Sequence, residues 1–360
     1  MQKFAGLILL YWWLSVFTVM AQYNSAKTDA WLAANAPGMG GRVVLVVWKN
    51  GRVIYSNAVN EMTIRQKFVY SAIAKRTGKT ADLANFTPSK KEPIASCSKW
   101  LSAALVMTFV DEGKLKLDDT VGKYLPVLSK HGKGAITIGE CLSHLTGIVP
   151  QGLMENYEEH KTIGSTDDAI EQIANMQTEG KPGLVFHYSS VGLEIVGAVL
   201  EKISGKTFKA LFAERIAGPL DMKDTNFGDA TVPDPAGSGY STAMDYINFL
   251  EMILNKGVFN DKRILSERSI NQMQVNRCTA DVKVSYKPEG AESFGYGYGE
   301  WVMDGNSVGS PGLFGSFPWI DNEKKYAAFM MTYYLKSGDK SKRYLELKQV
   351  VDSSIGAPGQ

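Results

Sequence analysis

The 360-residue chain has few of the residues that bind metals or form disulfide frameworks. Its four histidines are isolated from one another, and its three cysteines have the spacing of neither a zinc site nor a disulfide framework. Its 39 basic and 37 acidic residues nearly cancel, which gives no reason to expect a nucleic-acid partner. Solenoid repeats and low-complexity tracts are also absent. We therefore expect a globular protein with no metal and no other cofactor.

After the first 21 residues, the chain has no apolar run long enough to cross a bilayer. The chain starts with the short basic segment Met1 to Lys3, and an uncharged apolar stretch follows from Phe4 to Met20. This pattern predicts a signal peptide that is cut after Ala21. The mature protein would then be exported, periplasmic or secreted, with no stable membrane insertion. An uncleaved membrane anchor is the alternative.

Strand-like segments near both ends of the chain enclose a helical middle. Two β-rich runs between Val43 and Tyr55 flank Asn50-Gly51, a dipeptide typical of a tight hairpin. Residues 307–320 and 326–334 are also strand-like. Between 117 and 227 the pattern is mostly that of helices separated by turns.

This order of elements predicts an α/β (α+β) protein whose sheet is built from both termini, with a mainly helical domain inserted between them. We expect the sheet domain to comprise residues 22–98 and 290–360. The helical domain would then comprise residues 99–289. Between the leader and the inserted domain, the hairpin would supply the N-terminal part of the sheet.

The segment from Pro93 to Trp100 contains a serine and a lysine three residues apart, Ser96 and Lys99. If a helix begins here, both side chains lie on the same face, roughly 5–6 Å apart at Cβ. A lysine amine removed from water can take the proton of a serine hydroxyl, and free N–H groups at a helix start can bind the oxyanion that forms. A capping serine beside a surface lysine is the alternative interpretation.

Five segments, in order, resemble landmarks of one enzyme family. They are Ile94-Ala95-Ser96-Cys97-Ser98-Lys99, 111–126, 136–148, 182–190 and 218–225. The chain resembles serine β-lactamases and penicillin-binding-protein type hydrolases, in particular class C β-lactamases, D-alanyl-D-alanine peptidases and related esterases. The resemblance implies a β-lactamase/transpeptidase-like fold, with an antiparallel sheet flanked by helices.

The same resemblance implies a role for each matching residue. Ser96 would be the nucleophile that forms an acyl-enzyme, and Lys99 would be its base. Tyr188 would pass the proton to the leaving group and help water attack later; a core tyrosine is the alternative. The backbone N–H groups of Ser96 and Leu313 would form the oxyanion hole.

Two of the expected substrate contacts depart from the family pattern. Ser190 stands where the family usually has asparagine, and a hydroxyl offers one donor where the amide offers two. Ser310-Pro311-Gly312 stands where the family usually has Lys-Thr-Gly or His-x-Gly, so the usual cation is missing. Ser190, Ser310 and Gly312 are the predicted substrate-binding residues, although a simple strand irregularity could also explain the last two. Recognition of penicillin-like anions should be weakened.

Two rival nucleophiles can be set aside. Ser307 lies in a G-x-S-x-G pattern, but that motif needs a following helix and a later histidine, and the last histidine is His187. Cys97 is next to Ser96, and adjacent helical residues point about 100° apart. Cys97 should therefore face away from Lys99 as a small buried thiol.

Three functions remain open from the sequence. The first is an exported serine hydrolase acting on a small ester or amide, favoured by the altered motifs. The second is a β-lactamase or a D-alanyl-D-alanine peptidase acting on cell-wall peptides or β-lactams. The third is a non-catalytic binding or sensing protein of the same fold. The expected partner is a small-molecule or peptide substrate, and the sequence leaves the oligomeric state open.

Overall fold

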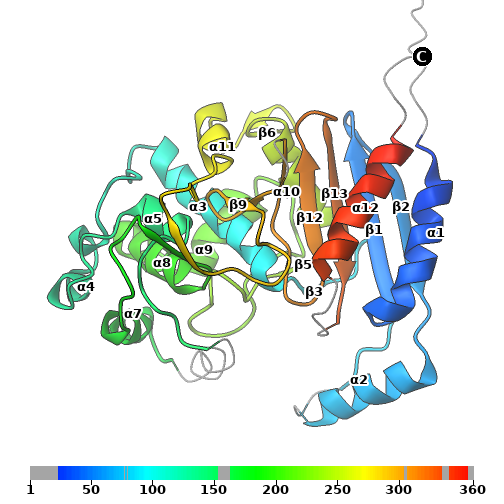
Figure 1. The fold of residues 1–360 in the computed structure, drawn as a ribbon, viewed down its shortest axis with the longest axis horizontal. Helices are drawn as coiled ribbons and strands as arrows, with labels where there is room; N and C mark the ends of the chain where they lie inside the picture. The colour runs from blue at the N-terminus through cyan, green and yellow to red at the C-terminus, as the bar shows by residue number, and fades with distance from the viewer. Residues whose placement is uncertain are drawn as a thin grey trace, which may run out of the picture.

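The computed structural model describes residues 23–76, 78, 80–152, 163–303, 306–334 and 340–355. The leader predicted at residues 1–21 lies outside these ranges. Within them, seven strands form one antiparallel sheet in the order β2-β1-β13-β12-β11-β10-β9. The first two strands come from the N-terminal part of the chain, and the other five come from its C-terminal part (Figure 1). The sheet is therefore built from both termini, as the sequence predicts.

The strands shorten across this sheet, from nine residues in β2 to two in β9. Their bounds are β1 Arg42–Lys49, β2 Arg52–Asn60, β9 Gly295–Tyr296, β10 Trp301–Val302, β11 Ser307–Gly309, β12 Phe317–Asp321 and β13 Tyr326–Thr332. Asn50 and Gly51 join β1 to β2 with φ of 52° and 78°, the positive values that a tight hairpin turn requires. The predicted hairpin is confirmed.

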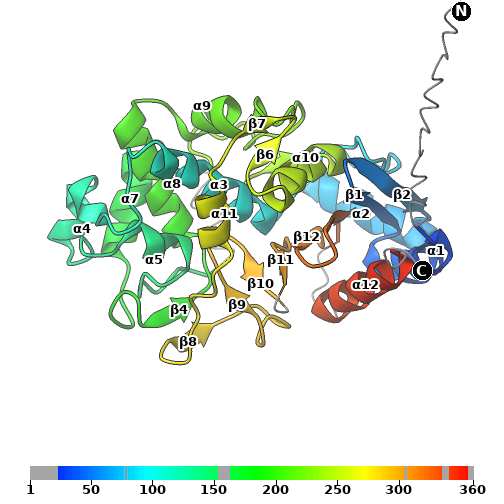
Figure 2. The same cartoon turned by 90° about the horizontal axis from the view of Figure 1, so that it is seen from above.

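Strand β1 is buried on both faces, which explains its unbroken apolar run. One face packs against α1 (Ser25–Asn35) and α12 (Lys340–Ser354), and the other packs into the large core that includes α3 (Ser98–Asp111) and α10 (Ala243–Leu254) (Figures 1 and 2). The first face carries Val43, Leu45 and Val47, and the second carries Val44, Val46 and Trp48. Because alternate side chains of a strand point to opposite faces, a strand covered on both sides must be apolar throughout.

Helix α3 runs through the centre of the molecule (Figure 2). Every residue from Ser98 to Phe109 is buried, as its apolar sequence predicts. The helix α8 packs against α3, α5 and α7. The bounds of the other helices are α2 Ile64–Arg76, α4 Pro126–Lys130, α5 Ile138–Leu142, α7 Thr166–Asn175, α8 Val191–Ser204, α9 Phe208–Phe212 and α11 Glu267–Met273.

In the described part of the chain, three short strand pairs lie outside the seven-stranded sheet. The antiparallel pair is β3 (Glu92–Pro93) with β5 (Tyr240–Ser241), and the parallel pair is β4 (Val185–His187) with β8 (Lys283–Tyr286). A third pair joins β6 (Val258–Phe259) to β7 (Lys262–Arg263). The chain passes directly from β3 to Ser96 and from β4 to Tyr188, so these pairs position the two segments that carry the predicted catalytic residues.

The predicted fold class is confirmed, since the antiparallel sheet is flanked by helices and a mainly helical region is inserted into it. Among the described residues, no helix is long and apolar enough to cross a membrane. The same residues contain no cluster of three or more side chains that could hold a metal ion.

Candidate active site

Ser96 lies in a single 3-10 turn, Ala95–Cys97, that leads into α3. The sequence predicts that the helix itself begins at Ser96, whereas it begins at Ser98. The turn is fixed by the Ser98 hydroxyl, which donates to the Ala95 carbonyl at 2.6 Å and accepts from the Gly239 N–H at 2.9 Å. Ala95 has a φ of 45°, a conformation that costs roughly 1–3 kcal/mol in a residue other than glycine.

The 3-10 turn brings Ser96 and Lys99 together, because residues three apart lie above one another in such a turn. The Lys99 Nζ donates to the Ser96 Oγ at 3.3 Å and to the Ala236 carbonyl at 3.0 Å. Lys99 is only 3% exposed, whereas Ser96 is partly exposed. The amine is thus withdrawn from water while the hydroxyl remains accessible, which is the arrangement that a serine nucleophile and its base need.

The Ala236 carbonyl belongs to a loop that sequence reasoning did not connect with the site. The Ala236 N–H donates to the Asp234 carboxylate at 2.7 Å, and the Ser102 hydroxyl of α3 donates to the Pro235 carbonyl at 2.5 Å. These bonds hold the Ala236 carbonyl toward Lys99. An Asp-Pro pair indicates a turn in the sequence, but nothing there shows which helix the turn faces.

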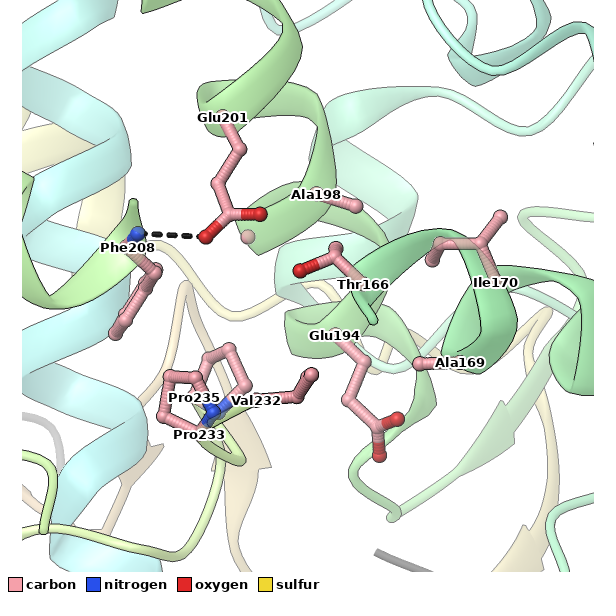
Figure 3. A pocket seen from close by; sticks show the side chains of 11 residues that line it. Thr166, Ala169, Ile170, Glu194, Ala198, Glu201, Phe208, Val232, Pro233 and Pro235 are labelled. Atoms are coloured by element: carbon pink, nitrogen blue, oxygen red, sulfur yellow. Dashed lines mark hydrogen bonds between the residues drawn. The ribbon is translucent and has the colours of Figure 1, made fainter. Parts of the chain in front are cut away.

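A small pocket lies behind this loop, between α7, α8 and residues 232–235 (Figure 3). On its wall, the Glu201 carboxylate accepts from the Phe208 N–H at 2.7 Å. Its volume of about 20 Å³ suits about one water molecule and is far too small for a substrate. The pocket is therefore not a second substrate-binding site.

Tyr188 lies directly after β4, beside Lys99. Its N–H donates to the Tyr286 carbonyl of β8 at 3.1 Å, and its ring centre lies 4.8 Å from the Lys99 Nζ. The ring also packs against Trp301, at 5.1 Å between ring centres. Among the described residues, none forms a hydrogen bond with its hydroxyl. The structure thus brings all three predicted catalytic residues together and leaves the phenol available to a bound molecule.

The His144 ring packs against the Tyr188 ring. This histidine is isolated in the sequence, so the contact could not be predicted there. Its ring centre lies 4.6 Å from that of Tyr188, and its Nδ1 accepts from the Ser189 N–H at 3.4 Å. Burial lowers the pKa of His144 well below its usual value, and the charge of Lys99 acts in the same direction. His144 is therefore neutral, and its role here is to position the Tyr188 segment.

The segment from Ser310 to Leu313 lies against the turn that carries Ser96. A side chain on Gly312 would come within 2.3 Å of the Ile94 carbonyl oxygen, so only glycine allows this approach. Within the described part of the chain, neither the Ser96 N–H nor the Leu313 N–H donates to another protein group. Leu313 is 41% exposed and Ser96 is partly exposed, so these two N–H groups remain the candidates for the oxyanion hole.

The two serines expected to bind substrate differ in what their hydroxyls do. The Ser310 hydroxyl is buried and lies 3.2 Å from the carbonyl oxygens of both Ser96 and Gly299. It would have to leave these acceptors to contact a substrate. Ser190 is the residue before α8 and is partly exposed, and its hydroxyl has no partner among the described residues. Of the two serines, Ser190 is therefore the one whose hydroxyl can contact a substrate without leaving another hydrogen-bond partner.

The rival nucleophiles are both engaged elsewhere. Ser307 is buried in β11, where its hydroxyl donates to the Asp321 carboxylate at 3.2 Å. Cys97 is buried, as expected, and its thiol points to the Ser316 carbonyl at 3.7 Å. Burial raises the pKa of Cys97 above its usual value, which keeps it a thiol.

The sequence profile of the β-lactamase family matches residues 32–351, which is most of the chain. This protein belongs to the β-lactamase family. The family profile thus covers the whole site, from the turn before α3 to the last strand of the sheet. The resemblance predicted from the ordered landmarks is confirmed.

Solved structures of this family share the fold. A candidate β-lactamase from Bacteroides dorei DSM 17855 has a TM-score of 0.76 at 25% identity, over 93% of this chain and 99% of that one. A family VIII carboxylesterase has a TM-score of 0.72 at 16% identity, over 93% and 98% of the two chains. The predicted β-lactamase/transpeptidase-like fold is therefore confirmed, and the second of these similarities concerns the fold alone.

Among curated relatives, penicillin-binding protein 4 of Amycolatopsis lactamdurans is 28% identical over 222 residues. The match covers 51% of this chain and 56% of that protein. Protein Rv1367c of Mycobacterium tuberculosis is 27% identical over 242 residues, which cover 53% of this chain and 60% of that protein. The matches thus span little more than half the length of these relatives.

Proposed function

We propose that this family member is an exported serine hydrolase that cleaves a small ester or amide through an acyl-serine intermediate. The observation that carries the proposal is the contact between the buried Lys99 amine and the accessible Ser96 hydroxyl, at 3.3 Å. A hydroxyl needs such a base to become a nucleophile at neutral pH. Export rests on the basic and apolar N-terminal segment of the sequence.

The proposed first step requires Lys99 as the neutral amine, which accepts a hydrogen bond from the Ser96 hydroxyl. The Ser96 Oγ attacks the substrate carbonyl carbon while its proton passes to the lone pair of the Lys99 Nζ. The negative charge on the carbonyl oxygen is stabilised by the free N–H groups of Ser96 and Leu313. As the intermediate collapses, the bond to the leaving group breaks and Tyr188 passes a proton to that group. Water then attacks the acyl-serine, with the same groups acting in reverse.

The groups expected to contact the substrate, Ser190 and the Ser310-Pro311-Gly312 segment, carry no charge, which favours a neutral substrate. Ser310-Pro311-Gly312 brings no cation to the strand beside Ser96, and the Ser310 hydroxyl is occupied by backbone carbonyls. Ser190 offers a single hydroxyl near Tyr188 in place of an amide. A small ester or amide without a carboxylate would bring no unpaired charge to these groups. A penicillin-like anion would bring one.

Turnover of three substrates tests the proposal: a p-nitrophenyl ester, nitrocefin and a D-alanyl-D-alanine peptide. We expect the ester to be cleaved fastest and to leave a transient acyl adduct that intact-protein mass spectrometry detects on the wild type. The Ser96→Ala variant is the control for spontaneous hydrolysis. Faster turnover of nitrocefin or of the peptide would refute the substrate preference. The absence, with all three substrates, of both an adduct and turnover above the Ser96→Ala control would refute the hydrolase.

A further inference from the structure

Helix α2 (Ile64–Arg76) exposes large apolar side chains that contact nothing in the core. None of its residues is buried. Ile64 is 89% exposed and Phe68 is 73% exposed, and Val69 and Ile73 are exposed as well. Single exposed apolar residues are common on protein surfaces, but Ile64 and Phe68 are four residues apart and lie on the same face of α2, where together they form an apolar surface that can bind something.

The opposite side of α2 attaches the helix to the body of the protein. The Gln66 Nε2 donates to the Pro37 carbonyl at 2.8 Å, and the Tyr70 ring packs edge-on against Tyr333 at 5.5 Å. The Arg42 guanidinium lies 5.0 Å from the centre of the Tyr70 ring. Phe68 is two residues from Tyr70, about 200° around the helix. Phe68 therefore points away from the body, and Figure 1 shows α2 projecting from it.

The charge of α2 is of one sign. Arg65, Lys67, Lys75 and Arg76 are all exposed, and the helix contains no acidic residue. Exposed aromatic and aliphatic side chains combined with arginine and lysine are typical of helices that lie in the interface of an anionic bilayer. Protein interfaces are instead depleted in lysine, and two copies of α2 facing each other would set four cations against four. The charge therefore favours a lipid surface over a protein partner.

We propose that α2 docks this protein on the surface of an anionic bilayer. The exposed apolar side chains, Phe68 and Ile64 first among them, enter the headgroup region, and the four cations contact lipid phosphates. Long basic side chains can extend their charge toward lipid phosphates while their apolar stems stay against apolar surface. Basic and apolar side chains on the same helix can therefore both be accommodated in the headgroup region. Docking of this kind requires no helix that spans the bilayer.

Ring contacts link the body-facing side of α2 to the candidate active site. Tyr333, which packs against Tyr70 of α2, also stacks on Phe314 at 4.7 Å between ring centres. Phe314 follows Leu313, the proposed oxyanion donor. The side of α2 that faces the body is thus linked to the rim of the site, and the side with Phe68 and Ile64 is the one free to bind a bilayer.

Hydrogen exchange of the full chain, followed by mass spectrometry, tests the docking at the helix itself. The protein is titrated with vesicles of phosphatidylcholine, either alone or mixed with phosphatidylglycerol. We expect exchange in the peptide covering α2 to slow with the mixed vesicles and to stay unchanged with phosphatidylcholine alone. Because the readout is confined to α2, binding through any other segment does not count as support.

Matched variants separate α2 from general electrostatics. R65Q/K75Q/R76Q should weaken the vesicle affinity measured at α2 about a hundredfold, because each cation near the surface contributes severalfold. I64S/F68S should abolish the slowing. K130Q/K181Q/K262Q removes three exposed cations elsewhere and should leave the affinity unchanged. Unchanged melting temperatures show that all the variants are folded.

Three results would overturn the proposal. The first is equal slowing of α2 exchange with both kinds of vesicle, and the second is an equal loss of affinity in the K130Q/K181Q/K262Q variant. The third is hydrogen exchange of the α2 peptide that is no slower with vesicles than without them. Self-association that protects α2 in the absence of vesicles would give this result. The outcome does not depend on hydrolase activity, so this proposal and the proposed function can fail separately.

Discussion

Helices α3 and α2 have almost the same length, 14 and 13 residues, but opposite relations to the rest of the protein. In α3, every residue from Ser98 to Phe109 is buried, and the turn before it carries Ser96. In α2, no residue is buried. The position of the Lys99 side chain is thus set by contacts on every side, and the turn before α3 holds the partly exposed Ser96 beside it. The α2 side chains remain available to something outside the protein. The proposed chemistry thus depends on α3, and the proposed docking depends on α2.

The largest expected effect comes from the base on α3. Lys99→Met keeps most of the buried stem but removes the amine that contacts the Ser96 hydroxyl. We expect esterase turnover to fall about 10²–10⁴-fold, the usual contribution of a general base. Steady-state kinetics measure this loss, and circular dichroism confirms that the variant is folded. Turnover within a few fold of the wild type would exclude Lys99 as the base.

A matched pair of phenylalanines tests the contrast in burial directly. Phe109 in α3 is 1% exposed, whereas Phe68 in α2 is 73% exposed. Phe109→Ala should lower the free energy of unfolding by about 3–5 kcal/mol, and Phe68→Ala should change it by less than about 0.5 kcal/mol. Urea denaturation of both variants measures the difference. Similar losses at both positions would mean that α2 is packed into the fold after all.

The close approach of Gly312 to the turn before α3 predicts a loss of stability smaller than that of Phe109→Ala. In Gly312→Ala the new methyl group would lie 2.3 Å from the Ile94 carbonyl oxygen and 3.1 Å from the Cys97 Sγ. We expect a loss of about 1–3 kcal/mol in the free energy of unfolding and a lower turnover, because the Leu313 donor must shift. Gly152→Ala, where the methyl group meets nothing within 4 Å, is the control. Equal free energies of unfolding and equal turnover in the two variants would contradict the tight packing at Gly312.

Glu300 is the one buried carboxylate beside α3 whose two oxygens both lack a partner among the described residues. Burial raises its pKa well above the usual 4.5, although the charge of Lys256 opposes this. The folded protein therefore holds the proton longer than the unfolded chain does, and Glu300 lowers stability as the pH rises above 4.5.

Glu300→Gln removes this dependence on pH. Its advantage in the free energy of unfolding over the wild type should be smallest near pH 4.5 and should grow by at most about 1.4 kcal/mol per pH unit above it. Urea denaturation of both proteins across this range measures the advantage. An advantage that stays constant, or that shrinks as the pH rises, would contradict the raised pKa.

The sequence predicts the parts of the site that depend on local spacing. Ser96 and Lys99 are three residues apart in an apolar segment, and this alone brings them together. The β1–β2 hairpin follows from Asn50-Gly51 in the same way. The order of the family landmarks added Tyr188 and the strand near Leu313, which no local pattern would have joined to Ser96.

Contacts between distant segments could not be predicted. The Ala236 carbonyl reaches Lys99 across 137 positions in the sequence, and His144 packs against Tyr188 although α7 and β4 lie between them in the chain. Nothing in the sequence indicates that the Ser310 hydroxyl turns inward to the Ser96 and Gly299 carbonyls. The exposed apolar side chains of α2 could not be predicted either. The basic residues of this segment indicate a solvated face, and only the structure shows that Phe68 and Ile64 are exposed beside them.

The central claim is that Ser96 is the nucleophile, and covalent labelling with a fluorophosphonate tests it most directly. Intact-protein mass spectrometry should show one phosphonyl group on the wild type and none on Ser96→Ala, and peptide mapping should place it on Ser96. Labelling that persists in Ser96→Ala, or that maps to Ser307 or Cys97, would contradict the account.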